Sequence, residues 1–451
     1  MKQFNVLVIT AIIAFFTNSL SAQNTENSPL SRYGVGDLKA MSTGWMSGMA
    51  NAGTAYISDQ LYNPLNPAAS SFLKQTDFEL GIFAKYNSLK DNNNHKIQDW
   101  SGSLNNISMA IPLRNSINEI LDRKKYNHSY AIQFGLTPYS SVGYRSELVD
   151  SSDKSNRLDR FLQGDGLINS FNLGGSYRYK NVAIGLQLNY LFGNLNYNQN
   201  VLFSSIPAVY DSYLNDKVHI RGWKPSVGFL YRKIINQKEV EKDNSVRKKM
   251  FSAGLVINLP SNYTGYYSGL HVTRFSENIA VVDTVLYVNE RKEKGSLPFG
   301  FKAGVYYTHK EKYGLMGSFN FEDWQSAEFT EGILGSTKAT SQFLVGGWYK
   351  PGQSDFDKFI KKSIYRFGAY LGNDYRSIGG NEAKSYGLTF GWGYPILFLR
   401  QDAMVHINFD VGNRTLENQI TGLKPLSETY FMIHFGISIN DNEWFLKRRY
   451  N

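Results

Sequence analysis

The 451-residue chain contains no cysteine. This absence excludes a lipid-anchored N-terminal cysteine, a disulfide scaffold and a metal site held by thiolates. Long apolar runs are missing as well, because no stretch after Phe16 approaches the roughly eighteen apolar residues that a membrane-spanning helix needs. Histidine is scarce, with seven residues scattered along the chain. The sequence therefore excludes a helical membrane protein and a disulfide-rich secreted domain.

Familiar catalytic motifs are also absent. The chain has no His-Glu-x-x-His, no Gly-x-Ser-x-Gly and no Gly-x-x-x-x-Gly-Lys pattern. The acidic pair Glu322-Asp323 follows an apolar stretch, and we interpret it as a solvated pair at a strand end. We therefore predict a protein that is not an enzyme and that holds no cofactor and no metal.

The first residues have the pattern of a secretion signal. Lys2 precedes an apolar run from Val6 to Phe16, and small residues lead to Ala22. A charged start, a short apolar region and a small residue at the cut are typical of a signal peptide, here predicted for residues 1–22. An exported chain has little access to nucleic acid. The net charge of +10 is therefore interpreted as solvated lysines that also favour anionic lipid head groups.

Alternation of apolar and polar residues dominates the rest of the chain. Successive side chains of a strand point to opposite faces, so each alternating stretch has one apolar face and one polar or glycine-rich face. A soluble sandwich can show the same alternation, but the 30 Tyr, 29 Phe and 7 Trp residues suit the aromatic girdles of a membrane barrel. Fourteen such stretches begin near Phe78, Ser103, Ser129, Ile168, Val182, Val218, Met250, Leu297, Gly314, Ser341, Ser363, Lys384, Ala403 and Glu428.

This pattern predicts an all-β, transmembrane, antiparallel up-and-down barrel of about fourteen strands over residues 76–440. An even strand count places both ends of the barrel on one side, normally the periplasm, so residues 441–451 are predicted to be a periplasmic tail. The predicted outer loops are 88–102, 140–167, 194–217, 260–296, 323–340, 374–383 and 413–427. The predicted periplasmic turns are 113–128, 179–181, 234–249, 309–313, 351–362 and 395–402.

Residues 23–75 lack clean alternation and are rich in Gly, Ala, Met, Asn and Ser. A free linker would be more polar and less aromatic. We therefore predict an ordered segment that packs inside the barrel, where small residues permit close approach of backbones.

Three polar residues of the last two strands are candidates for a network in the lumen. His406, Asp410 and His434 fall on the polar faces of neighbouring strands. A hydrogen-bond network is favoured over a metal site, because no third ligand appears at a characteristic spacing.

The segment from Gly48 to Ala69 resembles the N-terminal region of the FadL family of outer-membrane proteins. The resemblance centres on Asn66-Pro67-Ala68-Ala69, which follows the stretch GMANAGTA. Weaker similarities follow in the family's order at LPFGFKAGVYY, FNFEDWQS and FLVGGWYKP. The independent count of fourteen strands equals that of the family.

The resemblance implies a hatch inside the barrel and a channel for uptake of hydrophobic small molecules such as long-chain fatty acids. Ligand would diffuse passively and leave sideways beside an inward kink in the third strand, where Gly135 and Pro138 are the candidates. Equally, Gly135 could make room for the hatch and Pro138 could end the strand. The residues expected to gate the hatch are Tyr56, Ile57, Tyr62, Asn66 and Pro67.

A second hypothesis belongs to a different functional class. The turns over 113–128 and 234–249 are unusually long and charged. They are interpreted as solvated excursions, with a docking surface as the alternative. In that case the chain would be a structural, shuttle or accessory subunit of an outer-membrane secretion or assembly complex. The predicted partners are outer-membrane lipid and lipopolysaccharide of a Gram-negative cell, a hydrophobic ligand, and an outer-membrane or periplasmic protein.

Overall fold

The computed structural model describes most of the chain. The described residues are 26–90, 96–114, 118, 127–150, 158–203, 210–243, 246–274, 283–352, 358–378, 380–398, 401–416 and 426–443. The predicted signal peptide and residues 444–451 of the predicted tail lie outside them. No helix in the described part is long and apolar enough to cross a membrane.

The strands have their apolar faces outward, as in a protein solvated by lipid. In the strand that begins at Val182, the side chains of Val182, Ile184 and Leu186 are 40–60% exposed. Ala183 and Gln187, which alternate with them, are buried. This burial pattern is the reverse of a soluble sandwich, so the alternation is that of a membrane barrel.

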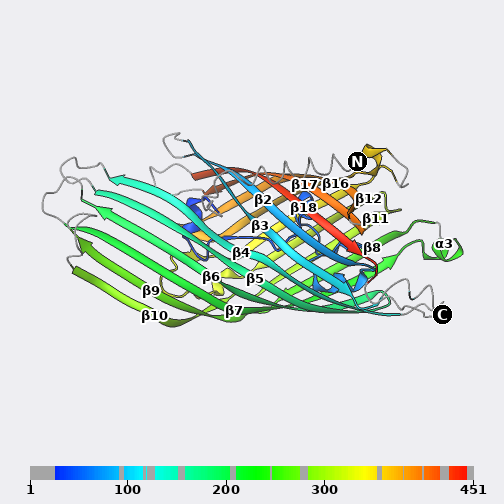
Figure 1. Ribbon diagram of the computed structural model, residues 1–451, viewed down its shortest axis with the longest axis horizontal. Coiled ribbons are helices and arrows are strands. Elements are labelled where there is room, and N and C mark those ends of the chain that lie inside the picture. The colour runs from blue at the N-terminus through cyan, green and yellow to red at the C-terminus, as the bar shows by residue number, and fades with distance from the viewer. Residues whose placement is uncertain are drawn as a thin grey trace.

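Antiparallel strands form one closed wall (Figure 1). The last strand of the wall pairs with the first, from Ser427 opposite Lys90 to Asp441 opposite Thr76, so the sheet has no free outer strand. The strands are β1 (Asp37–Leu38), β2 (Thr76–Lys90), β3 (Lys96–Pro112), β4 (His128–Asp150), β5 (Leu158–Tyr179), β6 (Val182–Leu202), β7 (Asp211–Ile234), β8 (Lys249–Asn258), β9 (Ser261–Arg274), β10 (Asp283–Leu297), β11 (Gly300–His309), β12 (Tyr313–Glu322), β13 (Ser336–Thr337), β14 (Thr340–Tyr349), β15 (Ile364–Ile378), β16 (Asn381–Phe398), β17 (Gln401–Leu416) and β18 (Leu426–Asp441).

The described strands make fourteen spans of the wall, which confirms the predicted barrel. β7 pairs with β9 along its first half and with β8 along its second half, so β8 and β9 are one span with a short interruption. β10 and β11 are likewise one span, since β10 pairs with β9 and β11 with β8. The two-residue strands β1 and β13 are additional to the wall, because they pair with β4 and β15 as short attachments.

The spans differ greatly in length. β4 to β7 contain 21–24 residues each, whereas β12 and β14 contain 10. Much of what the sequence predicted as outer loops, over 140–167, 194–217 and 260–296, is therefore strand. These extensions stay paired because they enclose a second apolar cluster, which includes Leu195, Val218 and Ile220.

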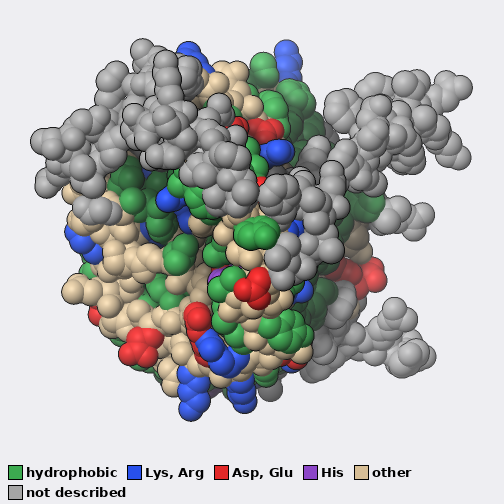
Figure 2. Space-filling view, turned by 90° about the vertical axis from the view of Figure 1, so that its left-hand side faces the viewer, with side chains coloured by type: hydrophobic (Ala, Val, Ile, Leu, Met, Phe, Trp, Pro, Cys, Tyr) green, Lys and Arg blue, Asp and Glu red, His purple; other side chains and the backbone are tan. Residues whose placement is uncertain are grey.

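The two ends of the barrel are easily told apart (Figure 1). We call the turn end the end that carries α3 (Gln237–Lys242), α4 (Phe359–Lys362) and the tight turns at 180–181 and 310–312. The opposite end is the loop end. Figure 2 faces the loop end and shows hydrophobic side chains mixed with charges of both signs.

Residues 26–75, which we call the N-terminal segment, pack against the inward face of the wall. The segment contains β1 and three 3-10 helices, η1 (Pro29–Arg32), η2 (Ser47–Met49) and η3 (Pro67–Phe72); a fourth, η4 (Trp324–Ser326), follows β12. Its backbone touches glycines of the wall: a Cβ placed on Gly44 would lie 2.8 Å from the Cα atom of Gly436. Glycine on both sides is what allows this approach.

Candidate functional site

The wall of the barrel is interrupted between β3 and β4. The two strands pair only from Ile107 opposite Leu136 to Pro112 opposite Ala131, although both continue toward the loop end. Pro138 follows the last pair and has no N–H to donate to a neighbouring strand. The β4–β5 ladder shifts its register between Pro138 and Ser140. Beyond Leu136, the described part of β4 therefore presents an edge that β3 does not cover.

Gly135 and Pro138, the two candidates for a third-strand kink, have different surroundings. Gly135 remains inside the ladder, and a Cβ there would lie 2.9 Å from the Cβ atom of Ser108. Close approach of the two strands thus accounts for this glycine. The interruption begins after Leu136, so Pro138 lies within it, next to the register shift at Tyr139.

The N-terminal segment occupies the exposed edge of β4. In β1, Asp37 pairs with Ser141 and Leu38 pairs with Ser140. The backbone N–H of Lys39 donates to the carbonyl of Tyr139 at 2.9 Å. A strand edge carries a row of unpaired backbone groups, and here β1 satisfies them in place of β3.

The same segment also contacts β3, so it bridges the interruption from inside. The side-chain amide of Asn105 donates to the carbonyl of Ser42 at 3.1 Å. Nearer the loop end, the side-chain amide of Asn27 donates to the carboxylate of Asp99 at 2.7 Å. The wall between β3 and β4 is thus completed by residues 26–42 rather than by direct strand pairing.

A cluster of buried charges ties this part of the segment to the wall. Asp37 lies 2.6 Å from a guanidinium nitrogen of Arg376 and 2.9 Å from one of Arg414. Lys85 lies 2.7 Å from Glu26 and 3.1 Å from Glu428. We call these six residues together with Lys39 and Asp374 the charge cluster; the full membership is Glu26, Asp37, Lys39, Lys85, Asp374, Arg376, Arg414 and Glu428.

The carboxyl groups of the segment remain ionised inside this cluster. Burial acts to raise the pKa of Asp37, but the nearby positive charges of Arg414 and Arg376 hold that pKa well below its usual range. Burial also acts to raise the pKa of Glu26, and the charges of Lys39 and Lys85 lower it overall. Removing one partner of such a buried pair leaves an uncompensated charge, which costs about 3–5 kcal/mol.

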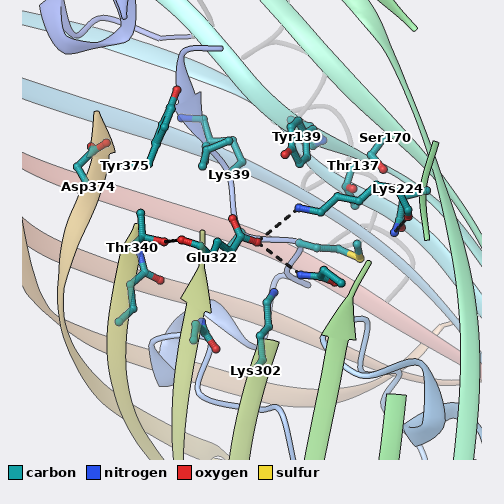
Figure 3. A pocket seen from close by; sticks show the side chains of 18 of the residues that line it. Lys39, Thr137, Tyr139, Ser170, Lys224, Lys302, Glu322, Thr340, Asp374 and Tyr375 are labelled. Carbon is teal, nitrogen blue, oxygen red and sulfur yellow. Dashed lines mark hydrogen bonds and ion pairs between the residues drawn. The ribbon is translucent and has the colours of Figure 1, made fainter. Parts of the chain in front are cut away.

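A cavity of about 270 Å³ lies directly beside the interruption (Figure 3). Pro138 and Tyr139 of β4 line it, as do Leu38 to Met41 of the segment. From the far wall, Lys224 lies 3.4 Å from Glu322, with Lys302 on the neighbouring strand. The cavity is therefore lined by charged and hydroxyl or amide side chains and by apolar side chains in comparable measure.

Sequence reasoning missed the charged lining of this cavity and mistook Glu322 for a solvated residue. In the structure, Glu322 also accepts hydrogen bonds from Asn258 at 3.5 Å and from the indole of Trp324 at 2.9 Å. The prediction was wrong because a single charged residue near a strand end looks the same whether it faces bulk water or the lumen. The sequence does not show that Glu322 points into the lumen, where it meets Lys224 of a different strand.

The residues predicted to gate the hatch lie near the turn end and hold the segment in place. Tyr56 packs between Trp45 and Tyr306, with ring centroids 4.9 and 5.0 Å away. Ile57 is buried beside it, and the backbone N–H of Tyr62 donates to Asp77. These contacts anchor the segment, and none of these three residues lines the cavity beside β4.

Asn66 and Pro67 fix the last part of the segment. The side-chain amide of Asn66 donates to the carbonyls of Thr54 at 2.9 Å and Phe229 at 3.1 Å. Its side-chain oxygen accepts from the N–H of Ala68 at 3.0 Å, which caps η3. Pro67 lies against Gly185, where a Cβ would come within 2.4 Å of its carbonyl carbon.

His406, Asp410 and His434 all face inward but have separate partners. His406 contacts the hydroxyl of Ser438 at 2.8 Å. Asp410 accepts from the hydroxyl of Tyr370 at 2.9 Å. His434 lies against the ring of Phe83, with centroids 5.9 Å apart. The three residues thus contribute to several local contacts, and the described residues contain no group of His, Cys, Asp or Glu that could hold a metal ion.

Comparison with known proteins places this geometry in a family. The model of the family described as BamG matches residues 2–451. The chain belongs to the BamG family. No curated protein sequence matches it.

Solved structures show that this BamG-family barrel shares its fold with FadL-like channels. A Pseudomonas aeruginosa FadL homologue is 14% identical, with a TM-score of 0.56 over 90% of this chain and 99% of that one. The toluene transporter TodX of P. putida is 13% identical, with a TM-score of 0.53 over 90% and 99%. The Ralstonia pickettii toluene transporter TbuX is 12% identical, with a TM-score of 0.51 over 89% and 98%. The resemblance found in the sequence is therefore confirmed for the fold, and the chain is an outer-membrane barrel.

Proposed function

We propose that this BamG-family protein is an outer-membrane channel for hydrophobic small molecules, including amphipathic ones such as long-chain fatty acids. Ligand enters the cavity beside β4 and leaves sideways between β3 and β4. Flow follows the concentration gradient, since nothing in the proposal requires an energy source. Lys224 and Lys302 in the cavity suit a ligand that carries a carboxylate at one end.

The observation that carries the proposal is the interrupted ladder between β3 and β4. It lies next to the cavity, and residues 26–42 close it with only two residues of strand pairing. A two-residue ladder contributes few hydrogen bonds, so the ion pairs of the charge cluster are the main contacts that movement of β1 must break. The neighbouring β4–β5 ladder, by contrast, is long and continuous on either side of its register shift. Movement of β1 would connect the cavity to the lipid phase without opening an aqueous pore.

A disulfide across the seam between β1 and β4 tests this function. Leu38 and Ser140 are opposite residues in an antiparallel ladder, where Cα atoms lie about 4.5–5.5 Å apart, within disulfide range. The chain contains no other cysteine. We expect the oxidised Leu38→Cys, Ser140→Cys variant to take up radiolabelled dodecanoate or toluene at least tenfold more slowly than the reduced form.

The matched control places the same crosslink in a permanent seam. Lys90 and Ser427 are opposite residues of β2 and β18, so the Lys90→Cys, Ser427→Cys variant should take up ligand equally well when oxidised and reduced. Equal uptake by both redox states of the Leu38–Ser140 variant would show that ligand does not pass between β3 and β4.

The second candidate function is a subunit of an outer-membrane protein assembly or secretion complex. The charge cluster favours it, because the ion pairs across the lumen hold the segment as a fixed plug. If the lumen is closed in this way, the lipid-facing wall and the turn end remain as surfaces that can bind a partner protein. At the turn end, α3 presents exposed Lys238 and Lys242.

Affinity purification from native membranes tests this second function. A complex subunit should co-purify with another outer-membrane protein in fixed proportion. The double variant Lys238→Ala, Lys242→Ala should then lose that partner while the barrel remains folded. Recovery of the chain alone after crosslinking in intact membranes would reject a complex subunit, and it would leave the uptake experiment unaffected.

A further inference from the structure

A second cavity, of about 370 Å³, opens at the turn end on the other side of the N-terminal segment. Met49 and residues 56–61 of the segment form one wall, and the ends of β7, β8, β11, β14, β15 and β17 form the other. It shares no lining residue with the cavity beside β4. It is therefore a separate site, to which neither proposed function assigns a role.

Positive charge dominates the lining of this turn-end cavity. Its cations are Arg232, Arg247, Lys248, Lys350 and Arg366. Its acids are Asp59 and Glu311, which gives an excess of three positive charges. Each acid already has a partner: Asp59 pairs with Lys74 outside the lining, and Glu311 lies 3.7 Å from Arg247, one of the five cations. The cavity beside β4 differs, because Lys224, Arg376 and Arg414 in its lining each have a carboxylate partner.

Arg366 is the most unusual member of this lining. Its side chain is almost fully buried, at 2% exposure. Its guanidinium lies 3.3 Å from a ring nitrogen of His406 and 3.7 Å from the sulfur of Met404. No carboxylate lies within ion-pair distance of Arg366 among the described residues. A buried guanidinium without a counter-charge is costly, so a position like this is expected where an anion binds.

Arg232 repeats the pattern on the neighbouring part of the wall. Its guanidinium stacks on the ring of Phe72, 4.7 Å from the centroid. Its Nε atom is buried and has no hydrogen-bond partner in the described structure. Two guanidinium groups thus line one small cavity: that of Arg366 is almost fully buried, and that of Arg232 is partly buried with an unpartnered Nε atom.

Apart from Ser58, Gln60 and Thr308, the rest of the lining is aromatic or aliphatic. Tyr56, Tyr306 and Trp348 contribute aromatic rings, and Met49 and Met250 contribute thioether side chains. Tyr56 and Tyr306 are already in ring contact, at 5.0 Å. A ligand with an anionic group and an adjoining apolar body would satisfy both parts of the cavity.

We propose that the turn-end cavity binds a phosphate group attached to an apolar body, either a phosphate monoester or the head group of an anionic phospholipid. Arginine presents a planar fork of N–H donors that matches phosphate oxygens in pairs. An excess of three positive charges suits a phosphate better than a single carboxylate. This site does not depend on the proposed channel function, because it lies away from the path between β3 and β4.

Calorimetric titration of the full-length protein with phenyl phosphate, in a non-ionic detergent, tests the proposal. We expect saturable binding at one site, with benzyl alcohol binding at least tenfold more weakly. Arg366→Gln and Lys248→Ala should each weaken binding of phenyl phosphate at least tenfold. Lys361→Ala is the matched control, because it removes the same charge from α4 at the same end without altering the cavity lining, and it should leave the Kd unchanged.

Two further measurements distinguish the source of the phosphate. The protein is reconstituted in nanodiscs of phosphatidylglycerol or of phosphatidylcholine. If the site takes an anionic lipid head group, phosphatidylglycerol should occupy it and abolish the binding of phenyl phosphate that is seen in phosphatidylcholine. Unchanged binding in both lipids would assign the site to a soluble phosphate ester. Because Arg366→Gln could disturb folding, Lys248 at the partly exposed rim provides the second variant. Equal binding of benzyl alcohol, or equal loss in Lys248→Ala and Lys361→Ala, would overturn the proposal.

Discussion

At the scale of single residues, the N-terminal segment is positioned by glycine contacts and by ion pairs. Gly44 and Gly48 of the segment meet Gly436 and Gly391 of the wall, and a Cβ on Gly48 would lie 2.9 Å from the Cα atom of Gly391. Such contacts leave no space for a side chain on either partner. Asp37 then fixes the segment through Arg376 and Arg414.

Substitution of Gly436 tests the glycine contact. Gly436→Val places a branched side chain where the Cβ alone would already lie 3.0 Å from the Cα atom of Gly44. We expect overpacking to destabilise the docked segment by about 1–3 kcal/mol, seen as faster cleavage of the segment by added protease. Gly317→Val is the control, since the nearest atom to a Cβ there is 4.0 Å away. Equal cleavage rates in the two variants would contradict a close contact at Gly436.

At the scale of elements, β1 takes over a task that full-length strands perform elsewhere in the wall. β3 and β4 part after Leu136, and the segment supplies the missing pairing from inside. We propose that the segment also acts as a plug in a lumen that a barrel of this width would otherwise leave open to water.

Deletion of residues 28–60 tests the role of the segment as a plug. The deletion removes η1, β1 and η2 but retains the whole wall, so we expect the barrel to insert normally. Permeability to large polar antibiotics and single-channel conductance should both rise, since water would fill the vacated lumen. If the protein is a channel, the deletion should also abolish regulated uptake of hydrophobic small molecules. If it is a subunit of a complex, the deletion should mainly disturb assembly of that complex. Antibiotic sensitivity and conductance at wild-type levels would contradict a plug.

At the scale of the whole molecule, the fourteen spans make a barrel that is much longer on the side of β4 to β10 (Figure 1). Because β2 begins and β18 ends at the turn end, both ends of the barrel emerge together. An even strand count normally places that end in the periplasm, so the long extensions would face the cell exterior.

Epitope insertion tests this orientation. A tag placed between β9 and β10, at residues 275–282, should bind antibody on intact cells, whereas a tag within 238–243 in and just after α3 should bind only after the outer membrane is opened. Boiling should also shift the mobility of both tagged proteins on gels, because a closed ladder without edges resists detergent. Reversed accessibility would show that the turn end faces outward.

The strands could be predicted from the sequence alone because alternation is a local property. All fourteen predicted starting points fall within or next to the observed spans, and the tight turns after Tyr179 and His309 appear where they were expected. An apolar side chain at every second position gives each strand one face that suits lipid, and the polar or glycine-rich face then points into the lumen. The resemblance at Asn66 to Ala69 likewise depends on a contiguous stretch of sequence.

Tertiary structure alone decided the strand lengths, the interruption between β3 and β4, and both cavities. The predicted loops over 140–167 and 194–217 are largely strand because distant apolar side chains meet inside the extension, and pairing between distant residues leaves no local periodic signal. Lys224 and Glu322 are 98 positions apart in sequence. Arg366 is distinguished because no carboxylate of the described residues lies within ion-pair distance of it. The sequence thus determined which residues face lipid, whereas closure of the barrel determined which polar residues meet inside it.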